Sequence, residues 1–217
     1  MMFRDRYEAG EALAEHLREF AARPDVIVLA LPRGGVPVGH VVARELGVPL
    51  DVFVVRKLGT PGQVELAMGA IASGGVRVLN ADVVESLGIP EWAIEQVARQ
   101  EQEELERRER QYRGDRLPRD VRGKTVILVD DGLATGSSMR AAAAALRKAG
   151  AARIVVAVPV ASRATCDQLR EEGNEVVCAT TPEPFYAVGQ WYKDFAQTTD
   201  EEVRELLERA TMKDTSR

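Results

Sequence analysis

Five short runs of consecutive apolar residues constrain most strongly how this chain can fold. They are Val26–Leu31, Val52–Val55, Val126–Val129, Ile154–Val160 and Val176–Ala179. Continuous apolar runs of this length, rather than alternating ones, are typical of strands that are covered on both faces. Three of the runs are followed by helical patterns, at Val36–Leu46, Ser137–Ala149 and Arg163–Glu171. The alternation predicts an α/β fold, Rossmann-like, with a parallel sheet and helices on both faces.

Composition excludes several classes of protein. The 217 residues suffice for one sizeable core and a small addition. A net charge of −5 argues against a broad basic surface for nucleic acid. The apolar runs are far too short to span a membrane, and the first residues, MMFRDRYEAG, contain no apolar stretch of the signal-peptide type. We therefore expect a cytoplasmic protein with neither a nucleic-acid nor a membrane partner.

The chain has two cysteines, Cys166 and Cys178. They show no CxxC spacing, and no histidine lies near them in the sequence. Two reduced, structural thiols are the expected state in a cytoplasmic protein, and neither a disulfide nor a metal site is expected.

Two regions depart from the strand–helix alternation. The segment Pro90–Arg113 has a long, highly charged helical pattern, with an acid four residues before an arginine at Glu103/Arg107, Glu104/Arg108 and Glu106/Arg110. A solvated helix is favoured there over a helix that binds a partner. The segment from Thr180 concentrates aromatic residues, although aromatics make up only 5% of the chain. A final helix is predicted at Glu201–Arg209.

The segment VILVDDGLATGSSM, Val126–Met139, places two acids at the end of a predicted strand. In an open parallel sheet, ligands bind beyond the carboxyl ends of the strands. Asp130 and Asp131 lie at that edge. Their carboxylates can accept hydrogen bonds from sugar hydroxyls, or help to neutralise a hydrated Mg²⁺.

The same segment continues into the start of a predicted helix near Ser137. Unpaired amides and the partial positive charge at a helix N-terminus suit a phosphate, which the hydroxyls of Thr135 and Ser138 can also hold. Gly136 lets the backbone approach the ligand closely. A ribose 5-phosphate would satisfy both ends of the turn. Each part taken alone, a strand ending in acids or an ordinary Ser or Thr N-cap, is common.

Val126–Ser138 resembles the phosphoribosyl pyrophosphate (PRPP) motif of the type I phosphoribosyltransferases. In that family the two acids hold the ribose 2- and 3-hydroxyls, and the Thr-Gly-Ser/Thr loop cradles the 5-phosphate. The resemblance implies that PRPP binds to Asp130, Asp131, Ala134, Thr135, Gly136, Ser137 and Ser138. It also implies Mg²⁺ bound together with PRPP, near Asp130 and Asp131 and held through water or ligand hydroxyls. Dimers are common in this family, so a homodimer is a further expectation.

Two further segments resemble parts of the same family. LPRGGVPVG, Leu31–Gly39, is similar to its pyrophosphate loop, in which Arg33 would supply charge while Gly34 and Gly35 allow close approach of the backbone. The alternative is an ordinary glycine turn between strand and helix.

VVRKLGTPGQVELAMGAIA, Val54–Ala72, is similar to the family's mobile loop, which closes over PRPP and excludes water. Lys57 would contact pyrophosphate there, and Arg56 could stabilise the same charge; the alternative is a solvated strand end. With these assignments, the expected catalytic residues are Arg33, Lys57, Asp130 and Asp131.

FYAVGQWYKDF, Phe185–Phe195, resembles the nucleobase segment of the 6-oxopurine phosphoribosyltransferases. By that resemblance Tyr186 would stack on a base, Val188 would present backbone groups to its edge, and Asp194 would read an exocyclic amine. Trp191 and Tyr192 are alternative stacking residues. An aromatic cluster that only packs a small hood onto the core is an equally good interpretation.

The acceptor base remains open because a second clue conflicts with this one. The 6-oxopurine enzymes commonly carry an acid immediately before the threonine of the PRPP motif, where this chain has Ala134. In that respect Leu133–Gly136 is more like the adenine and uracil enzymes.

The resemblance implies one phosphoribosyltransferase domain over residues 1–217, with its core at about 24–180 and a helical insertion at 81–120. The hood would come from residues 1–20 and 181–210. The expected reaction transfers the 5-phosphoribosyl group of PRPP to a nitrogen base, a purine or pyrimidine, and releases pyrophosphate. The main alternative is a regulatory protein that binds PRPP or a nucleotide with little or no catalysis. A hydrolase that uses the acids to hold metal would need further ligands, which the sequence near Asp130 does not supply.

Overall fold

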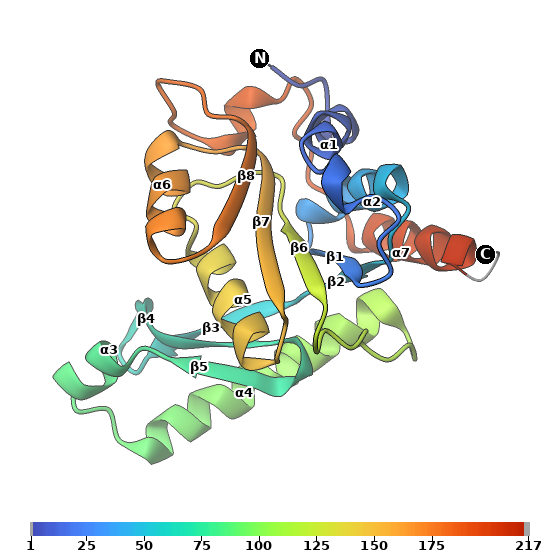
Figure 1. The fold of residues 1–217 in the computed structure, drawn as a ribbon. Coiled ribbons are helices and arrows are strands. Elements are labelled where there is room, and N and C mark those ends of the chain that lie inside the picture. The colour runs from blue at the N-terminus through green and yellow to red at the C-terminus, as the bar shows by residue number, and fades with distance from the viewer. Residues whose placement is uncertain (1, 215–217) are drawn as a thin grey trace.

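Five parallel strands form the central sheet of the computed structural model, which describes residues 2–214 (Figure 1). In spatial order they are β2 (Leu50–Val52), β1 (Val26–Ala30), β6 (Thr125–Val129), β7 (Arg153–Val160) and β8 (Glu175–Thr180). Every neighbouring pair is parallel. The parallel α/β fold predicted from the apolar runs is thus confirmed.

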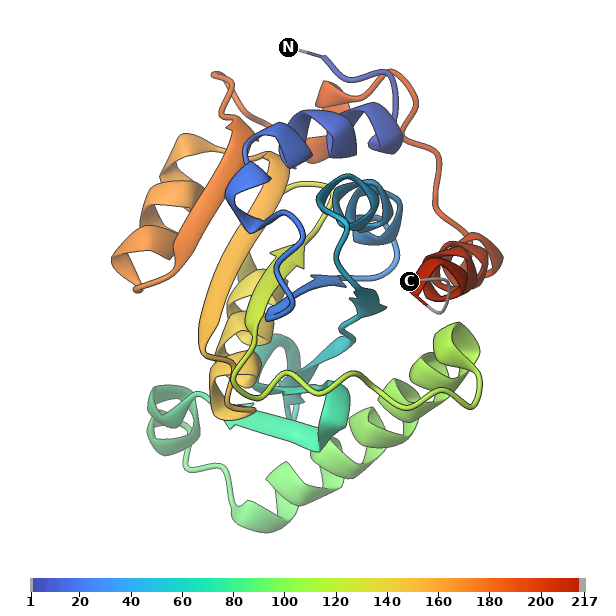
Figure 2. The ribbon, with the colours of Figure 1, turned by 45° about the vertical axis from the view of Figure 1, so that its right-hand side comes forward.

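Helices cover both faces of this sheet (Figures 1 and 2). One face carries α2 (Gly35–Leu46), with α1 (Arg6–Glu15) and α7 (Asp200–Asp214) packed against it; the other carries α5 (Ser137–Lys148) and α6 (Arg163–Glu171). Successive residues of a strand point to opposite faces of the sheet and so join different hydrophobic cores. Ile127 packs in the core on the α2 face, and Val126 and Leu128 pack in the core on the α5 face. Burial on both faces explains why the strands are apolar without alternation.

A second, antiparallel sheet was not predicted. It contains β3 (Val55–Thr60), β4 (Gln63–Ala72) and β5 (Val76–Leu79). The expected strand Val52–Val55 is therefore divided, and most of the expected mobile loop is a hairpin. The turn at Gly62 has a φ of 80°, which glycine adopts readily, and Leu58 and Met68 anchor the hairpin in the core.

The second sheet lies between α5 and α4 (Glu91–Arg113), and a short helix, α3 (Ala81–Ser86), precedes α4 (Figure 1). The expectation of a solvated helix holds for one face of α4 only. Its other face buries Ile94, Ala98, Leu105, Tyr112 and Arg113.

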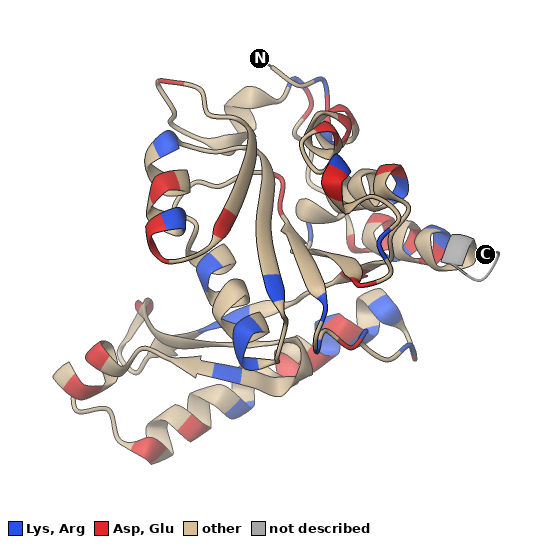
Figure 3. Ribbon diagram, in the orientation of Figure 1, with Lys and Arg blue, Asp and Glu red and all other residues tan. Residues whose placement is uncertain are grey.

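The exposed face of α4 carries charges of both signs (Figure 3). Glu104 pairs with Arg107 at 2.7 Å and with Arg108 at 2.8 Å, and Glu106 lies 3.9 Å from Arg110. The expected Glu103–Arg107 pair does not form, because Arg107 reaches the acid three residues before it. None of the described helices is long and apolar enough to cross a bilayer.

The N-terminal segment meets residues 191–194 above the carboxyl ends of the strands. Phe3 forms a parallel bridge with Tyr192, and the amide of Phe3 donates to Trp191 O at 2.8 Å. The Asp194 amide donates to Arg4 O at 2.9 Å. Phe3 and Tyr192 pack with Val160, which ends β7. The N-terminal segment and residues 191–194, together called the hood, therefore cover the edge of the sheet where the acids were expected.

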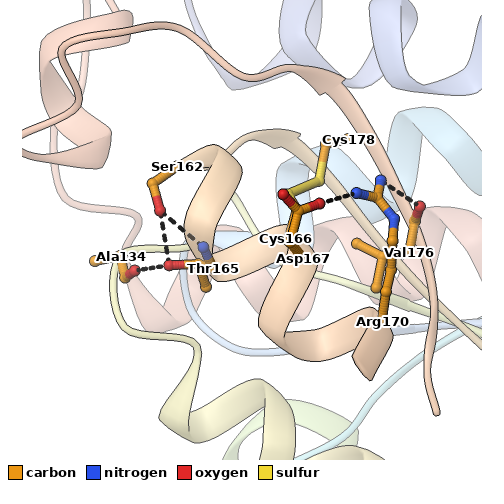
Figure 4. Close-up of a disulfide and its surroundings, with 8 residues drawn as sticks. All are labelled: Ala134, Ser162, Thr165, Cys166, Asp167, Arg170, Val176 and Cys178. Atoms are coloured by element: carbon orange, nitrogen blue, oxygen red, sulfur yellow. Dashed lines mark hydrogen bonds and ion pairs between the residues drawn. A yellow bond between two sulfur atoms is a disulfide. The ribbon is translucent and has the colours of Figure 1, made fainter. Parts of the chain in front are cut away.

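The two cysteines are joined, contrary to the expectation of reduced thiols. Cys166 on α6 and Cys178 on β8 form a disulfide, with their Cα atoms 7.4 Å apart (Figure 4). Sequence spacing could not show this contact, because it arises only when α6 folds back onto the strand that follows it.

Candidate active site

Two acids end the central strand β6. Asp130 and Asp131 follow Val129, and both side chains are half-buried. The Asp131 amide donates to Asp130 Oδ1 at 2.8 Å. Among the described residues, no hydrogen bond reaches Asp130 Oδ2 or Asp131 Oδ1. Asp130 thus uses Oδ1 within the protein and Asp131 uses Oδ2, which Arg6 contacts, and each keeps its other oxygen available.

Burial raises the pKa of Asp130 well above its ordinary value, and the negative charge of Asp131 raises that pKa further. Burial also raises the pKa of Asp131, while the guanidinium of Arg6 acts in the opposite direction. Two adjacent carboxylates with these pKa shifts favour a ligand that brings hydrogen-bond donors or positive charge.

The loop between β1 and α2 is in close contact with these acids. A Cβ added at Gly34 would lie 2.1 Å from Asp131 Oδ2, and one at Gly35 would lie 2.8 Å from Val129 O. Only glycine fits at either position. The Pro32–Arg33 peptide is cis. The structure thus brings the expected pyrophosphate loop and the expected ribose acids into direct contact.

Arg33, at the tip of this loop, is half-buried and has an acidic neighbour. Its Nη1 lies 3.7 Å from Oδ1 of Asp200, the first residue of α7. The guanidinium is therefore held beside the loop and keeps its charge close to the two glycines.

The loop after the acids is anchored from α6 and from α5. The Thr165 hydroxyl donates to Ala134 O at 2.8 Å, and Arg140 Nη1 donates to Thr135 O at 2.6 Å. Gly136 precedes α5 with a φ of 72°, and a Cβ there would meet Thr165 Cγ2 at 3.1 Å. These contacts fix the backbone that leads into the helix.

The start of α5 presents the groups expected for a phosphate. The amides of Gly136 and Ser138 have no acceptor among the described residues. Thr135 and Ser138 are exposed, and Ser137 is half-buried with its amide 3.5 Å from Thr135 Oγ1. Unpaired amides and exposed hydroxyls at a helix N-terminus form a suitable anion site.

The cations expected from the mobile loop are not part of this cluster. Lys57 is exposed on β3 opposite Ala70, and its ammonium group makes no hydrogen bond or ion pair with a described residue. Arg56 donates to Glu101 of α4 at 2.7 Å. The placement of Lys57 on pyrophosphate therefore stays a prediction.

The residues expected to bind a nucleobase fall into two groups. Tyr186 is 77% exposed, and Asp194 is exposed with its carboxylate accepting from the Ala196 amide at 3.0 Å. Val188 is half-buried and packs on Gly132, where an added Cβ would lie 2.5 Å from its Cγ1. Of these residues, only Val188 contacts the PRPP motif.

The aromatic residues of the hood pack mainly against one another. The ring of Tyr192 lies 5.7 Å from Phe3 and 5.0 Å from Phe195 between centroids. Its hydroxyl donates to Asp131 O at 2.6 Å, and burial raises the pKa of that hydroxyl. Trp191 packs at the margin of the same cluster. This is the hood-packing interpretation, which the sequence left open beside base stacking.

Arg6 is the main residue that the sequence did not assign to the site. Its Nε and Nη2 lie 2.9 and 2.8 Å from Asp131 Oδ2. Thr165, Arg140 and Asp200 were also missed. The only signal for Arg6 was its place in a charged N-terminal segment expected in the hood, and nothing local to Asp131 pointed to it.

The site offers few protein ligands for a metal ion. Within residues 2–214, no group of three or more His, Cys, Asp or Glu side chains could hold a metal. Mg²⁺ commonly keeps several waters and takes only one or two carboxylates beside substrate oxygens. The free oxygens of Asp130 and Asp131 fit that limited role.

Comparison with known proteins defines the family. The family model of the phosphoribosyl transferase domain matches residues 5–192, which include the acids, the glycine loop and most of the hood. The chain belongs to this family, as the resemblance of its PRPP motif implied.

One curated relative, from Mycobacterium tuberculosis H37Rv, is named provisionally as a phosphoribosyl transferase. It is 46% identical over 211 residues, which are 96% of this chain and 47% of the relative. The chain thus spans about half the length of that protein.

Two solved structures share the fold. The crystal structure of TT1426 from Thermus thermophilus is 43% identical, with a TM-score of 0.87, and 96% of this chain and 99% of that chain are covered. A Neisseria gonorrhoeae protein solved with bound ppGpp is 18% identical, with a TM-score of 0.50 over 96% of this chain and 98% of its own. At that identity the likeness concerns the fold alone.

Proposed function

We propose that this protein transfers the 5-phosphoribosyl group of PRPP to a nitrogen base and releases pyrophosphate. One observation carries the proposal: three groups suited to the three parts of PRPP adjoin one another at one edge of the sheet. The free oxygens of Asp130 and Asp131 suit the ribose hydroxyls. The unpaired amides at Gly136 and Ser138 suit the 5-phosphate, and the loop at Gly34 suits pyrophosphate.

The chemistry requires electrostatics and orientation rather than a nucleophile. The bond from ribose C1 to pyrophosphate oxygen breaks as the bond from C1 to the base nitrogen forms; pyrophosphate leaves with the electron pair, and the proton of that nitrogen is released to solvent. Positive charge grows at the ribose while negative charge grows on the leaving group. Arg33 and the backbone of its loop would stabilise the leaving group, and the two acids would hold the ribose in line.

The hood would limit a competing reaction. Water can attack the same ribose carbon, so a transferase has to exclude it. Tyr192 and Val188 close the side of the PRPP motif that faces the chain termini. This arrangement favours transfer to a base over hydrolysis.

Mg²⁺ is the cofactor that we propose, in keeping with the family resemblance. Asp130 and Asp131 would hold it indirectly, through water or the ligand's hydroxyls. When bound, it would neutralise charge on the diphosphate.

The proposed acceptor is a purine or pyrimidine base, and its identity is open. Ala134 cannot exchange a proton with a base, which disfavours the 6-oxopurine pattern. Tyr186, Trp191 and Asp194 are the proposed contacts with the base, and among the described interactions none joins them to the two acids. The homodimer implied by the resemblance likewise stays a proposal.

A direct assay tests the function. Pyrophosphate release from PRPP with Mg²⁺ would be measured with adenine, guanine, hypoxanthine, xanthine, uracil and orotate, while calorimetry follows PRPP binding. We expect release that depends on one base or a small set of bases. Absence of PRPP binding would refute the proposal.

A regulatory protein that binds PRPP or a nucleotide is the second candidate. The observation that favours it is the hairpin at Val55–Ala72. In this hairpin Arg56 forms an ion pair with Glu101, and the side chain of Lys57 makes no described contact with a residue of the proposed site. A protein that only binds PRPP needs no cation on the leaving group. Tight PRPP binding without release across the panel would support this candidate.

A further inference from the structure

A side chain from the extreme N-terminal region reaches the second acid of the PRPP motif. Arg6, the first residue of α1, places Nε and Nη2 at 2.9 and 2.8 Å from Asp131 Oδ2. The side chains of Arg6 and Asp131 are only 10% and 15% exposed. An ion pair so well shielded from water is a strong local restraint.

Arg6 is itself held on several sides. Its Nη1 donates to Ala196 O at 2.7 Å, and its guanidinium carbon lies 4.1 Å from the centroid of the Phe195 ring. Its backbone begins a helix that Asp5 caps, since the Asp5 carboxylate accepts from the amides of Tyr7 and Glu8 at 2.9 Å. The guanidinium is therefore fixed in place without any contact from a ligand.

These contacts orient the Asp131 carboxylate. Both nitrogens of Arg6 bind the same oxygen, Oδ2, which is also the oxygen packed against Gly34. The Tyr192 hydroxyl holds the backbone carbonyl of Asp131 at 2.6 Å. Oδ1 makes no hydrogen bond to a described residue. One oxygen is thus used to fix the carboxylate, and the other is left for a ligand.

We propose that Arg6 is a positioning residue, which holds Asp131 so that Oδ1 meets a ribose hydroxyl of PRPP. The proposal rests on the PRPP site proposed above. Arg6 does not touch the reacting atoms; it acts through Asp131. The arrangement also joins the N-terminal segment to residues 195 and 196 at the site, since Ala196 and Phe195 hold Arg6.

Binding of two ligands tests the proposal. Calorimetry with Mg²⁺ would compare PRPP and pyrophosphate on the unmodified protein, Arg6→Ala and the control Arg4→Ala. Arg4 is the matched control because it lies two residues away, pairs with Asp5 and is 67% exposed. We expect Arg6→Ala to weaken PRPP binding by about tenfold or more, as loss of a charge-assisted hydrogen bond does. Pyrophosphate has no ribose, so its affinity should stay within about twofold, as should both affinities of Arg4→Ala.

The two ligands separate a positioning role from a structural one. If Arg6→Ala lost both ligands equally, the hood would matter only for folding and the proposal would fail. Unchanged or tighter PRPP binding would overturn it as well, and tighter binding would mean that Arg6 competes with the sugar.

A double-mutant cycle gives the second measurement. If Arg6 acts through Asp131, then Arg6→Ala added to Asp131→Asn should weaken PRPP binding by less than about twofold more. Fully additive losses would contradict the proposal. Failure of the unmodified protein to bind PRPP would instead refute the proposed function itself, so the two failures are distinguishable.

Discussion

At the scale of single residues, two adjacent acids have different surroundings. The carboxylate of Asp131 pairs with the guanidinium of Arg6. Among the described hydrogen bonds, the carboxylate of Asp130 accepts only from the amide of Asp131. Burial raises the pKa of both, and the Asp131 charge adds to the effect on Asp130. The charge of Asp130 is therefore unfavourable in the folded protein, while that of Asp131 is partly compensated.

Asparagine substitutions should separate binding from stability at these positions. Both Asp130→Asn and Asp131→Asn remove an acceptor charge, so each should weaken PRPP binding by about tenfold or more. Asp131→Asn leaves Arg6 beside a neutral amide and should lower the free energy of unfolding by about 1–3 kcal/mol. Asp130→Asn removes an unfavourable buried charge and should raise that free energy.

Calorimetry with PRPP and urea unfolding of each variant would measure the two effects. Equal destabilisation by both substitutions would show that the charge of Asp130 is not the unfavourable one. Unchanged PRPP binding in both would show that the ribose lies elsewhere.

At the scale of elements, the helix α4 reaches the proposed pyrophosphate loop through α7. The Tyr112 hydroxyl donates to Asp200 Oδ1 at 3.1 Å, and Gln111 Nε2 donates to Asp200 Oδ2 at 2.8 Å. Asp200 is also the acid beside Arg33. Figure 2 shows α7 between α2 and the end of α4. The segment expected as an insertion is therefore joined to the site by one shared carboxylate.

Tyr112→Phe should test this junction. The ring stays and the hydroxyl is lost, so the free energy of unfolding should fall by about 0.5–1.5 kcal/mol near neutral pH. Burial, and then Asp200, raise the pKa of Tyr112 to about 12. Because the folded pKa exceeds the unfolded value of about 10, this hydroxyl stabilises the fold fully below pH 10 and progressively less up to pH 12.

The measurement is urea unfolding of the unmodified protein and of Tyr112→Phe at about pH 9 and about pH 11. The difference between the two proteins should shrink at the higher pH. A difference that stayed constant would mean that the Tyr112 hydroxyl is not held as the structure shows. Gln111→Ala serves as a control, since it removes a partner of the same acid from an exposed position without removing a titrating hydroxyl.

The disulfide links two further elements close to the site. Cys166 follows Thr165, whose hydroxyl holds Ala134 in the loop that follows the two acids (Figure 4). The bond therefore ties β8 to the helix that supports this loop.

Thiol titration in denaturant tests the disulfide. Without reductant we expect no reactive thiol, and after treatment with a dithiol we expect both. Reduction should also lower the free energy of unfolding by about 2–3 kcal/mol, as expected for a short closed loop. Two reactive thiols before reduction would restore the expectation of free cysteines.

At the scale of the whole molecule, one chain builds two sheets, two cores and a hood. The central sheet places the PRPP motif, and the hood places Arg6 and Tyr192 above it. The antiparallel sheet contributes residues to both cores, and α4 extends the α2-side core and meets α7. The proposed site is thus assembled from segments that span nearly the whole chain.

The sequence alone determined the parallel sheet and the position of the PRPP motif. Apolar runs report burial on both faces of a strand, and the string from Val126 to Ser138 combines a strand end, two acids and a helix start within one short segment. The close approach of the backbone at Gly34 and Gly35 was also predictable, because the two glycines directly follow a strand. All of these are local features, so neighbouring residues in the chain suffice to define them.

Only the tertiary structure decided which distant groups meet at the site. Arg6 and Asp131 are 125 residues apart in the chain, and Arg33 and Asp200 come from opposite parts of it. The hairpin after Val54, the hood packing of Tyr192 and the disulfide were likewise missed or left open. Such contacts depend on how complete elements pack, and a side chain that spans two elements leaves no periodic signal in the residues around it.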